Sequence, residues 1–331
     1  MIVAARRLGV PLLGIAFSVL AAGGTPDGVA TASPRRRGDA VGHTTTYLEH
    51  FPTTRDAVRE EDCGGRPACV RAVRWARQPR LGDDCKHVFF DVGANVGLHG
   101  RFLYEPQLFP RNKYHTVFPK VFGPDWRDKE KACVVAFEPN PAHRAWLTRQ
   151  AAAYTMQGWR YVAVFAAVGA GVDRNATLTF YRQDNGLKND WGFSIKNTYG
   201  GPAAAKYEVP FVDLSTFLHH HVGRSKKSND QVVLMKCDIE GSEFVVIPQL
   251  LKTGASRLID LMTLEVHKFF CPLDFPAAGA LPARHIDKAE CERLNAEFKP
   301  KLAEKGTGLL FLDDETEGTR DPARHPLPRR R

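Results

Sequence analysis

Acidic side chains and one histidine stand at the ends of four apolar stretches of this 331-residue chain. The stretches have the length and β-rich composition of buried strands. Their terminal polar residues are Asp91, Glu138, Asp238 with Glu240, and Glu265 with His267. Ligands of open α/β sheets bind beyond the carboxyl ends of the strands. The pattern therefore predicts a single site that collects these side chains.

The first strand runs directly into a glycine-spaced turn at residues 91–97. Gly93 and Gly97 let the backbone approach a ligand where a Cβ would collide. The spacing is not the Gly-x-Gly-x-x-Gly of dinucleotide sites, and the Asp91 carboxylate suits a cationic group better than a diphosphate. Glu138 stands where such sheets place the acid that takes the ribose hydroxyls. Together they indicate a nucleoside with a positive group, such as S-adenosylmethionine. The alternative is a tight turn with an acid that caps the next helix.

Strands and helices alternate along the chain, which predicts a doubly wound, mostly parallel α/β sheet covered on both faces. The expected strands are 87–92, 132–137, 161–168, 176–181, 208–212, 231–237, 259–266 and 308–312, and the expected helices are 70–77, 95–104, 142–153, 243–251 and 283–305. The aromatic, proline-rich insertion at 105–131 is too long for an ordinary connection. It is either a lid or a decoration of the domain.

The N-terminus has the pattern of a secretory signal. Arg6-Arg7 precede an apolar stretch, and small residues follow, so 1–32 is predicted to be a cleaved signal peptide or an uncleaved signal anchor. A stem and helical lead-in at 33–85, a catalytic domain at 86–313 and a disordered basic tail at 314–331 complete the organisation. We therefore expect a secretory-pathway protein, lumenal or membrane-anchored by its N-terminus. An Asn-Ala-Thr acceptor sequon for N-glycosylation begins at Asn175.

The net charge of +9 includes six arginines in two probable tails, at 35–37 and 329–331. No basic stripe interleaved with aromatics lies between them, so nucleic acid is not an expected partner. Seven cysteines suit a secretory compartment. Disulfides are expected among Cys63, Cys69, Cys85, Cys271 and Cys291, with open connectivity. Cys133 and Cys237 lie in apolar strands and are expected to be buried thiols, and the cysteine spacing predicts no metal site.

Three motifs, in order, resemble those of FkbM-type S-adenosylmethionine-dependent methyltransferases. They are Asp-Val-Gly-Ala-Asn-Val-Gly at 91–97, Phe-Glu-Pro-Asn-Pro at 137–141, and Met-Lys-Cys-Asp-Ile-Glu-Gly-Ser-Glu at 235–243. The resemblance spans roughly His87 to Val266 and implies a Rossmann-like class I fold with a seven-stranded sheet, one strand antiparallel. It implies O-methylation, commonly of sugar or polyketide hydroxyls. The long insertion, the absence of an acid after the third strand and the secretory leader depart from the family pattern.

The resemblance also assigns roles. The residues expected to bind S-adenosylmethionine are Asp91, Gly93, Asn95 and Gly97 at the methionine end, Glu138 at the ribose, and Asn140 in the same motif. Asp238, Glu240 and Glu243 are expected to face the reaction. An alcohol acceptor benefits from a base that draws off its proton. Asp238 is the leading candidate for that base, Glu240 a helper, and His267 an alternative base.

The expected function is O-methylation of a hydroxyl on a glycan or another small molecule. Two other functions stay open. One is a nicotinamide-dependent oxidoreductase on a similar sheet, against which the missing glycine fingerprint argues. The other is a non-catalytic lumenal binding module descended from a methyltransferase, against which the intact acids argue.

Overall fold

The structure is a computed structural model that describes residues 47–171, 176–182, 193–197, 205–222, 230–276, 283–312 and 326–329. The predicted leader, the acceptor Asn175 of the sequon and most of the tail lie outside these ranges. Within them, no helix is both long and apolar enough to cross a membrane. The four described tail residues lie against the domain, where the backbone carbonyl of Arg329 accepts a hydrogen bond from Gln157.

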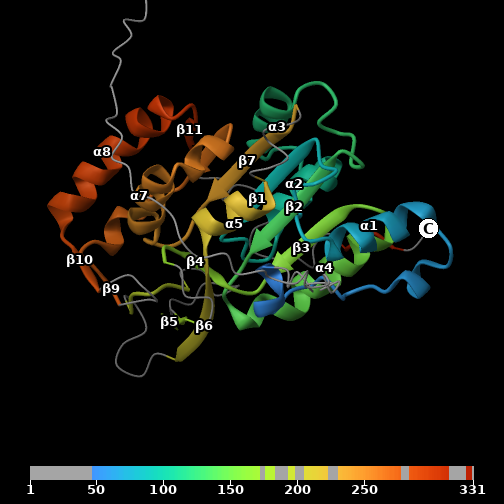
Figure 1. The fold of residues 1–331 in the computed structure, drawn as a ribbon, viewed down its shortest axis with the longest axis horizontal. Coiled ribbons are helices and arrows are strands. Elements are labelled where there is room, and N and C mark those ends of the chain that lie inside the picture. The colour runs from blue at the N-terminus through green and yellow to red at the C-terminus, as the bar shows by residue number, and fades with distance from the viewer. Residues whose placement is uncertain are drawn as a thin grey trace, which may run out of the picture. The chain divides into compact units, whose positions relative to one another are not determined.

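A parallel six-stranded sheet forms the centre of the domain, in the order β11-β8-β7-β1-β2-β3 (Figure 1). Its strands are β1 (His87–Val92), β2 (Ala132–Phe137), β3 (Arg160–Val164), β7 (Val232–Cys237), β8 (Leu261–Leu264) and β11 (Gly308–Phe311). Every residue of β1 and β2 is buried. This explains their continuous apolar sequences, since a central parallel strand has no solvent face. The predicted α/β fold class is confirmed.

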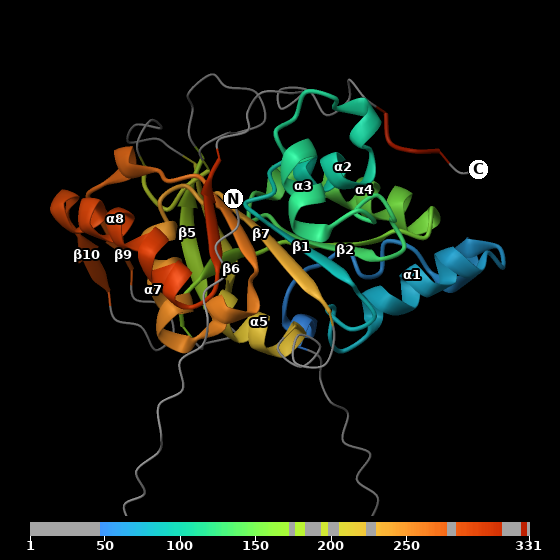
Figure 2. The same cartoon turned by 90° about the horizontal axis from the view of Figure 1, so that it is seen from above.

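Helices cover both faces of the sheet (Figure 2). They are α1 (Pro67–Arg77), α2 (Leu98–Tyr104), α3 (Tyr114–Phe122), α4 (Arg144–Met156), α5 (Leu214–His221), α7 (Glu243–Thr253) and α8 (Lys288–Glu304). Alternate side chains of β1 enter different cores. Phe89 packs with α2, α3 and α4, whereas Val88 and Phe90 pack with α5, α7 and α8. The strand period of two thus builds one apolar core on each face.

The main sheet differs in detail from the predicted seven strands. The predicted strand 161–168 divides after Val164, where β3 ends, and the N–H of Phe165 donates to Pro52 O of the lead-in at 2.8 Å. The free edge of β3 is then covered in the antiparallel sense by the lead-in, where Thr53 pairs with Val164. Among the described strands of the main sheet, all neighbours are parallel.

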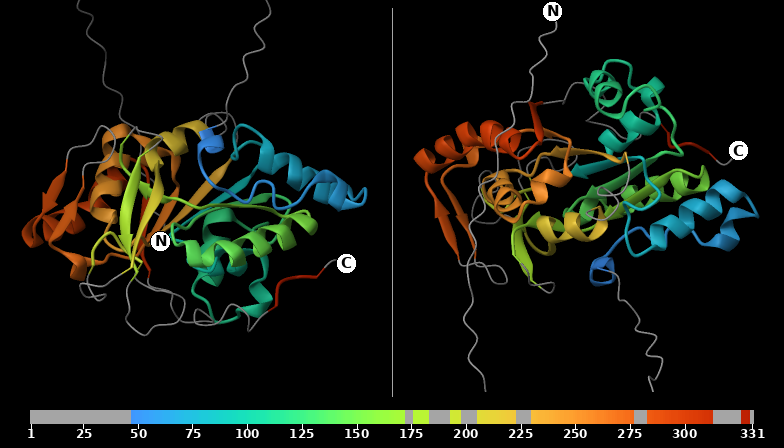
Figure 3. Two further views of the ribbon diagram at one scale, coloured as in Figure 1. Left: turned by 90° about the horizontal axis from the view of Figure 1, so that it is seen from below. Right: turned by 45° about the horizontal axis from the view of Figure 1, so that its top comes forward.

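The last part of the predicted strand 161–168 joins a second, three-stranded sheet. It contains β4 (Ala167–Gly169), β6 (Lys206–Asp213) and β5 (Thr177–Tyr181), and the antiparallel pair is β5 with β6. A further antiparallel pair, β9 (Leu273–Phe275) and β10 (Arg284–Ile286), lies beside α8, at the opposite end of the main sheet from α1 (Figure 3). The predicted helix 283–305 accordingly begins only at Lys288, where the Asp287 side chain caps it.

The insertion at 105–131 packs into the core. Its helix α3 buries Tyr114, Phe118 and Phe122, and Phe118 meets Phe89 of β1 edge to face with ring centroids 5.5 Å apart. The hydroxyl of Tyr114 lies 2.7 Å from Thr263 Oγ1 on β8. These contacts make the described part of the insertion a fixed cover over one sheet face. Its aromatic composition reflects that packing.

Three disulfides join Cys63 to Cys69, Cys85 to Cys133, and Cys271 to Cys291. The prediction that Cys133 is a free buried thiol was wrong. Its position at the start of buried β2 places it beside the segment that leads into β1, where Cys85 lies. Cys237 is free and buried, as expected.

Candidate active site

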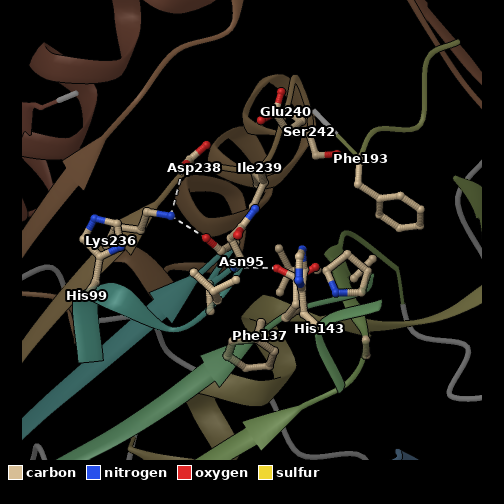
Figure 4. Close-up of a pocket in the computed structure, with 18 of the residues that line it drawn as sticks. Asn95, His99, Phe137, His143, Phe193, Lys236, Asp238, Ile239, Glu240 and Ser242 are labelled. Atoms are coloured by element: carbon tan, nitrogen blue, oxygen red, sulfur yellow. Dashed lines mark hydrogen bonds and ion pairs between the residues drawn. The ribbon is translucent and has the colours of Figure 1, made fainter. Parts of the chain in front are cut away.

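A pocket opens at the carboxyl ends of β1, β2 and β7 (Figure 4). Lys236, His99 and Asp238 lie at one side of it, and Phe193 lies at the other. Its polar lining includes Asn95, Glu138, Glu240 and Glu265, and its apolar lining includes Ala166, Val168, Phe180 and Phe193. The strand ends that the sequence singled out therefore do converge on one cavity.

The glycine turn brings β1 close to β7. Gly93 has a φ of +81°, in the region that glycine tolerates, and a Cβ there would overlap the carbonyl oxygen of Asp238. Asn95 also adopts a positive φ, of +49°, which asparagine tolerates better than most residues. Gly97 then begins α2 at a φ of +70°. The turn therefore lines the pocket and also packs closely against the Asp238 backbone.

Glu138 closes the pocket beneath this turn. Its Oε2 accepts a hydrogen bond from the Asn95 N–H at 2.6 Å, and its Oε1 accepts one from the Asn140 N–H at 2.7 Å. Burial raises the pKa of Glu138 to about 8, although these two donors favour the carboxylate. Each carboxylate oxygen keeps a second lone pair. Glu138 thus has acceptor capacity left for hydroxyl groups in the pocket.

A lysine links the acids of β1 and β7. Lys236 Nζ lies 2.8 Å from Asp238 Oδ2 and 3.9 Å from Asp91 Oδ1, and it also donates to the Gly93 carbonyl. Burial opposes the charge of Lys236, but the carboxylates outweigh it and raise the lysine pKa. Burial raises the pKa of Asp91 to about 6. For Asp238, burial acts upward, and the charges of Lys236 and His267 keep its pKa below the usual value.

His99 stands in the first turn of α2 and lines the pocket next to Lys236. Its Nδ1 lies 3.7 Å from Asp91 Oδ1, and its ring meets Tyr114 edge to face at 5.1 Å. Burial, reinforced by Lys236, lowers the pKa of His99 well below its usual value. A neutral imidazole therefore faces the pocket.

His267 lies behind the pocket among four carboxylates. Its Nδ1 is 2.6 Å from Glu243 Oε1, and its Nε2 is 3.4 Å from Glu265, 3.6 Å from Asp238 and 3.8 Å from Glu240. Burial opposes protonation, but these carboxylates, Glu243 foremost, raise the pKa of His267 to about 12. Burial also raises the pKa of Glu240 to about 8. A histidine charged at neutral pH is a poor proton acceptor, which favours Asp238 over His267 as a base.

The predicted residues fall into two groups. Those that line the pocket are Gly93, Asn95, Glu138, Asp238 and Glu240. Those that stand behind the lining are Asp91, Gly97, Asn140 and His267. The Asn140 side chain accepts from the Ala142 N–H at 3.0 Å and caps the short helix at 141–143. Its backbone N–H acts on the pocket through Glu138, and its Nδ2 lies 3.4 Å from Nε2 of His143, which lines the pocket.

Sequence reasoning missed Lys236, His99, Phe180 and Phe193. A lysine inside an apolar strand is a usable signal, because buried lysines need carboxylate partners. The two phenylalanines come from β5 and from residues 193–197, and they stack with centroids 5.2 Å apart. No local pattern connects them to a site that is built on the main sheet.

Residues 91–288 match the Methyltransferase FkbM domain family. This chain belongs to that family. The match covers more than half of the chain and begins at Asp91, so it includes all three motifs. No curated protein and no solved structure matches the chain. The resemblance seen in the sequence is confirmed, and a methyl donor is the cofactor that such a domain implies.

Proposed function

We propose that the protein is an S-adenosylmethionine-dependent O-methyltransferase that acts on a hydroxyl group. The observation that carries the proposal is the single pocket with Glu138 on its floor and the Asp238–Glu240 pair at its rim. These acids come from different strand ends and serve different parts of one reaction. The family supplies the reaction class, and the arrangement of the acids supports the choice of oxygen as acceptor.

The lining fits the proposed cofactor in both charge and polarity. Glu138 keeps lone pairs for a ribose diol, and the nearby Asp91 and Asp238 favour a cationic sulfonium end. Val168, Phe180 and Phe193 give an apolar wall suited to a flat base that is held without an acidic partner. This agrees with the absence of an acid after β3 in the sequence.

When bound, this cofactor supplies a methyl group on sulfur, and the sulfur leaves as a neutral thioether. Glu138 would hold the ribose end of this cofactor and the Asp91 and Asp238 carboxylates its cationic end, so that its methyl group would be available to an acceptor oxygen. The proton of the acceptor hydroxyl passes to an Asp238 carboxylate oxygen. Lys236 Nζ lies 2.8 Å from Asp238 Oδ2 and His267 Nε2 lies 3.6 Å from Oδ1, so the carboxylate is held in place from both sides. Positioning of this kind supplies much of the acceleration in methyl transfer.

The compartment is proposed to be the secretory pathway, with S-adenosylmethionine delivered to a lumen. The leader-like sequence at 1–32 and the three disulfides support it, because structural disulfides persist in oxidising compartments. The proposed acceptors are hydroxyl groups of glycans or other small molecules that pass through that compartment.

Full-length protein incubated with cofactor labelled on the methyl group tests this function. Glycan and lipid extracts serve as acceptors, and mass spectrometry locates the label. Label on an oxygen, lost in Asp238→Asn, supports the proposal. Cofactor binding without transfer to any acceptor indicates the non-catalytic module, and binding of a nicotinamide cofactor instead indicates the oxidoreductase. Either of these results overturns the proposal.

A further inference from the structure

We propose that Asp238, Glu240 and His267 form a binding site for a divalent metal ion at the acceptor end of the pocket. One ligand atom from each residue lies within 4.8 Å of the other two. Asp238 and Glu240 come from the connection between β7 and α7, and His267 follows β8, the neighbouring strand. The ligands are thus held by adjacent strand ends of the rigid sheet.

The orientation of His267 is the first observation behind this site. Glu243 is fully buried, and its Oε1 takes the Nδ1 side of the ring at 2.6 Å. This leaves Nε2 directed toward the pocket carboxylates. Metal-binding histidines almost always use one ring nitrogen in this way, with a carboxylate or carbonyl partner that fixes the ring. The 5% exposed His267 side chain therefore holds Nε2 toward the position of the ion, and metal binding there would release the Nε2 proton.

The spacing of the ligand atoms is the second observation. Nε2 lies 3.6 Å from Asp238 Oδ1 and 3.8 Å from Glu240 Oε2, beyond the usual hydrogen-bond range of about 2.7–3.2 Å. Two ligands on one ion, with bonds of about 2.1 Å at ordinary angles, stand roughly 3.0–3.7 Å apart. The 3.6 Å separation falls in this range, and the 3.8 Å separation lies just beyond it, so a shared ion needs a small closure of the side chains. Glu265 Oε1, 3.4 Å from Nε2, lies beside the same position. Lys236 occupies only Oδ2 of Asp238, so Oδ1 remains for the metal.

The balance of charge also favours a cation. Acidic side chains crowd this end of the pocket, and within the described ranges the cationic groups paired with them are Lys236 and His267. The carboxylates are Asp91, Asp238, Glu240, Glu243 and Glu265. Glu240 is held among them by a backbone with a φ of +53°, a conformation that non-glycine residues rarely adopt. Two carboxylate oxygens among three ligands favour a hard cation such as Mn²⁺.

This site rests on the proposed function for its role but not for its existence. Three protein ligands leave coordination positions open, and the pocket reaches them through Asp238, Glu240 and Glu265. An acceptor hydroxyl bound there would lose its proton more readily, because a metal ion lowers the pKa of a bound oxygen. Acceptors with two neighbouring oxygens, as in a sugar diol, suit two open positions.

Titration of the metal-free, full-length protein with MnCl₂, followed by electron paramagnetic resonance and calorimetry, tests the site. We expect one bound ion per chain, and at least a 100-fold loss of affinity in His267→Gln and in Glu240→Gln. Glu243→Gln should weaken binding 10- to 100-fold, as loss of an outer partner does. His285→Gln is the matched control, because His285 also pairs with a carboxylate, Asp274, at 2.7 Å but lies exposed elsewhere.

Cofactor binding measured in the presence of a chelator separates the two proposals. If the protein binds the cofactor but binds Mn²⁺ non-stoichiometrically or not at all, the metal site is overturned. The proposed methyltransferase function is unaffected by that result. Mn²⁺ binding that His267→Gln does not weaken also overturns it. Mn²⁺ bound at these residues without any cofactor binding supports the metal site and overturns the function. Circular dichroism of each variant establishes that it is folded before its affinity is compared.

Discussion

The carboxylate of Glu138 accepts a hydrogen bond of 2.6 Å from the backbone N–H of Asn95. This bond joins the acid at the end of β2 to the glycine turn after β1, so one hydrogen bond connects two sides of the pocket. The turn in this way holds Glu138 at the position where a ribose would meet it. A change in the geometry of the turn should therefore alter cofactor affinity through Glu138.

Replacement of Glu138 by Gln should weaken S-adenosylmethionine binding at least tenfold, because an NH₂ donor replaces one of the two oxygens that accept from the Asn95 and Asn140 N–H groups. It should also change the pH dependence of stability. The pKa of Glu138 is raised to about 8 in the folded protein, from a usual value of about 4.5. The folded state therefore holds this proton more tightly than the unfolded state, and its contribution to the free energy of unfolding is lost as pH rises from about 4.5 through 8. The melting temperature of the wild type, minus that of Glu138→Gln at the same pH, should fall between pH 5 and pH 9. A difference that stays constant over that range would contradict the pKa shift.

Much of this site was predictable because strand ends are local in sequence. Each of Asp91, Glu138 and Asp238 follows an apolar run, and parallel pairing brings the ends of such runs together. The cover of the pocket was not predictable, because Phe180 and Phe193 reach it through a separate sheet. The Cys85–Cys133 bond was missed for a similar reason, since strand composition alone does not show which segment lies beside Cys133.

The role of His267 also depends on distant partners. The sequence offers an imidazole near a strand end, but the hydrogen bond from Nδ1 to Glu243 follows from the packing of α7 against β8. That bond turns a candidate base into a charged or metal-binding group. The pKa of an isolated histidine, near 6.5, gives no indication of this change.

Gly93→Ala should abolish cofactor binding and lower the melting temperature by several degrees. The new Cβ would overlap the Asp238 carbonyl oxygen, and the φ of +81° is strained for alanine. Gly64→Ala separates these causes, because Gly64 has a φ of +57° and open space around its Cβ position. It should cost only about 1–2 kcal/mol of unfolding free energy and leave binding intact. Equal effects of the two changes would contradict the proposed backbone contact.

Glu105→Gln should destabilise the protein by about 3–5 kcal/mol, the usual effect of breaking a buried ion pair. Glu105 Oε1 lies 2.8 Å from Arg101 Nε and accepts from the Tyr154 hydroxyl at 2.6 Å. The Arg101 side chain is fully buried, so its charge would lose a neighbouring compensating partner. Glu61→Gln, in an exposed pair with Arg59, should change the free energy by less than about 1 kcal/mol. Urea denaturation of both variants measures the difference.

Removal of the Cys85–Cys133 disulfide by Cys85→Ala with Cys133→Ala should lower stability by about 4 kcal/mol, from the entropy of a loop with a sequence separation of 48. The Cys63–Cys69 pair closes a span of only 6 and should contribute less. Thermal melts of the wild type and the double variant, with and without reductant, measure these contributions to stability. In the double variant, reductant should have a smaller effect than in the wild type. An unchanged effect of reductant would show that this bond does not carry the stability.

Asp238→Asn should spare cofactor binding and reduce turnover by about 10²–10⁴, the usual contribution of a general base. The amide keeps the shape of the side chain, and Lys236 retains Asp91 at 3.9 Å and the Gly93 carbonyl as partners. The fold should therefore survive, with a small shift in melting temperature. Asp274→Asn is the control, because Asp274 is an exposed carboxylate outside the pocket lining, and it should leave turnover unchanged. Calorimetry with S-adenosylmethionine and single-turnover methyl transfer measure the two effects separately, and unimpaired transfer in Asp238→Asn would exclude Asp238 as the base.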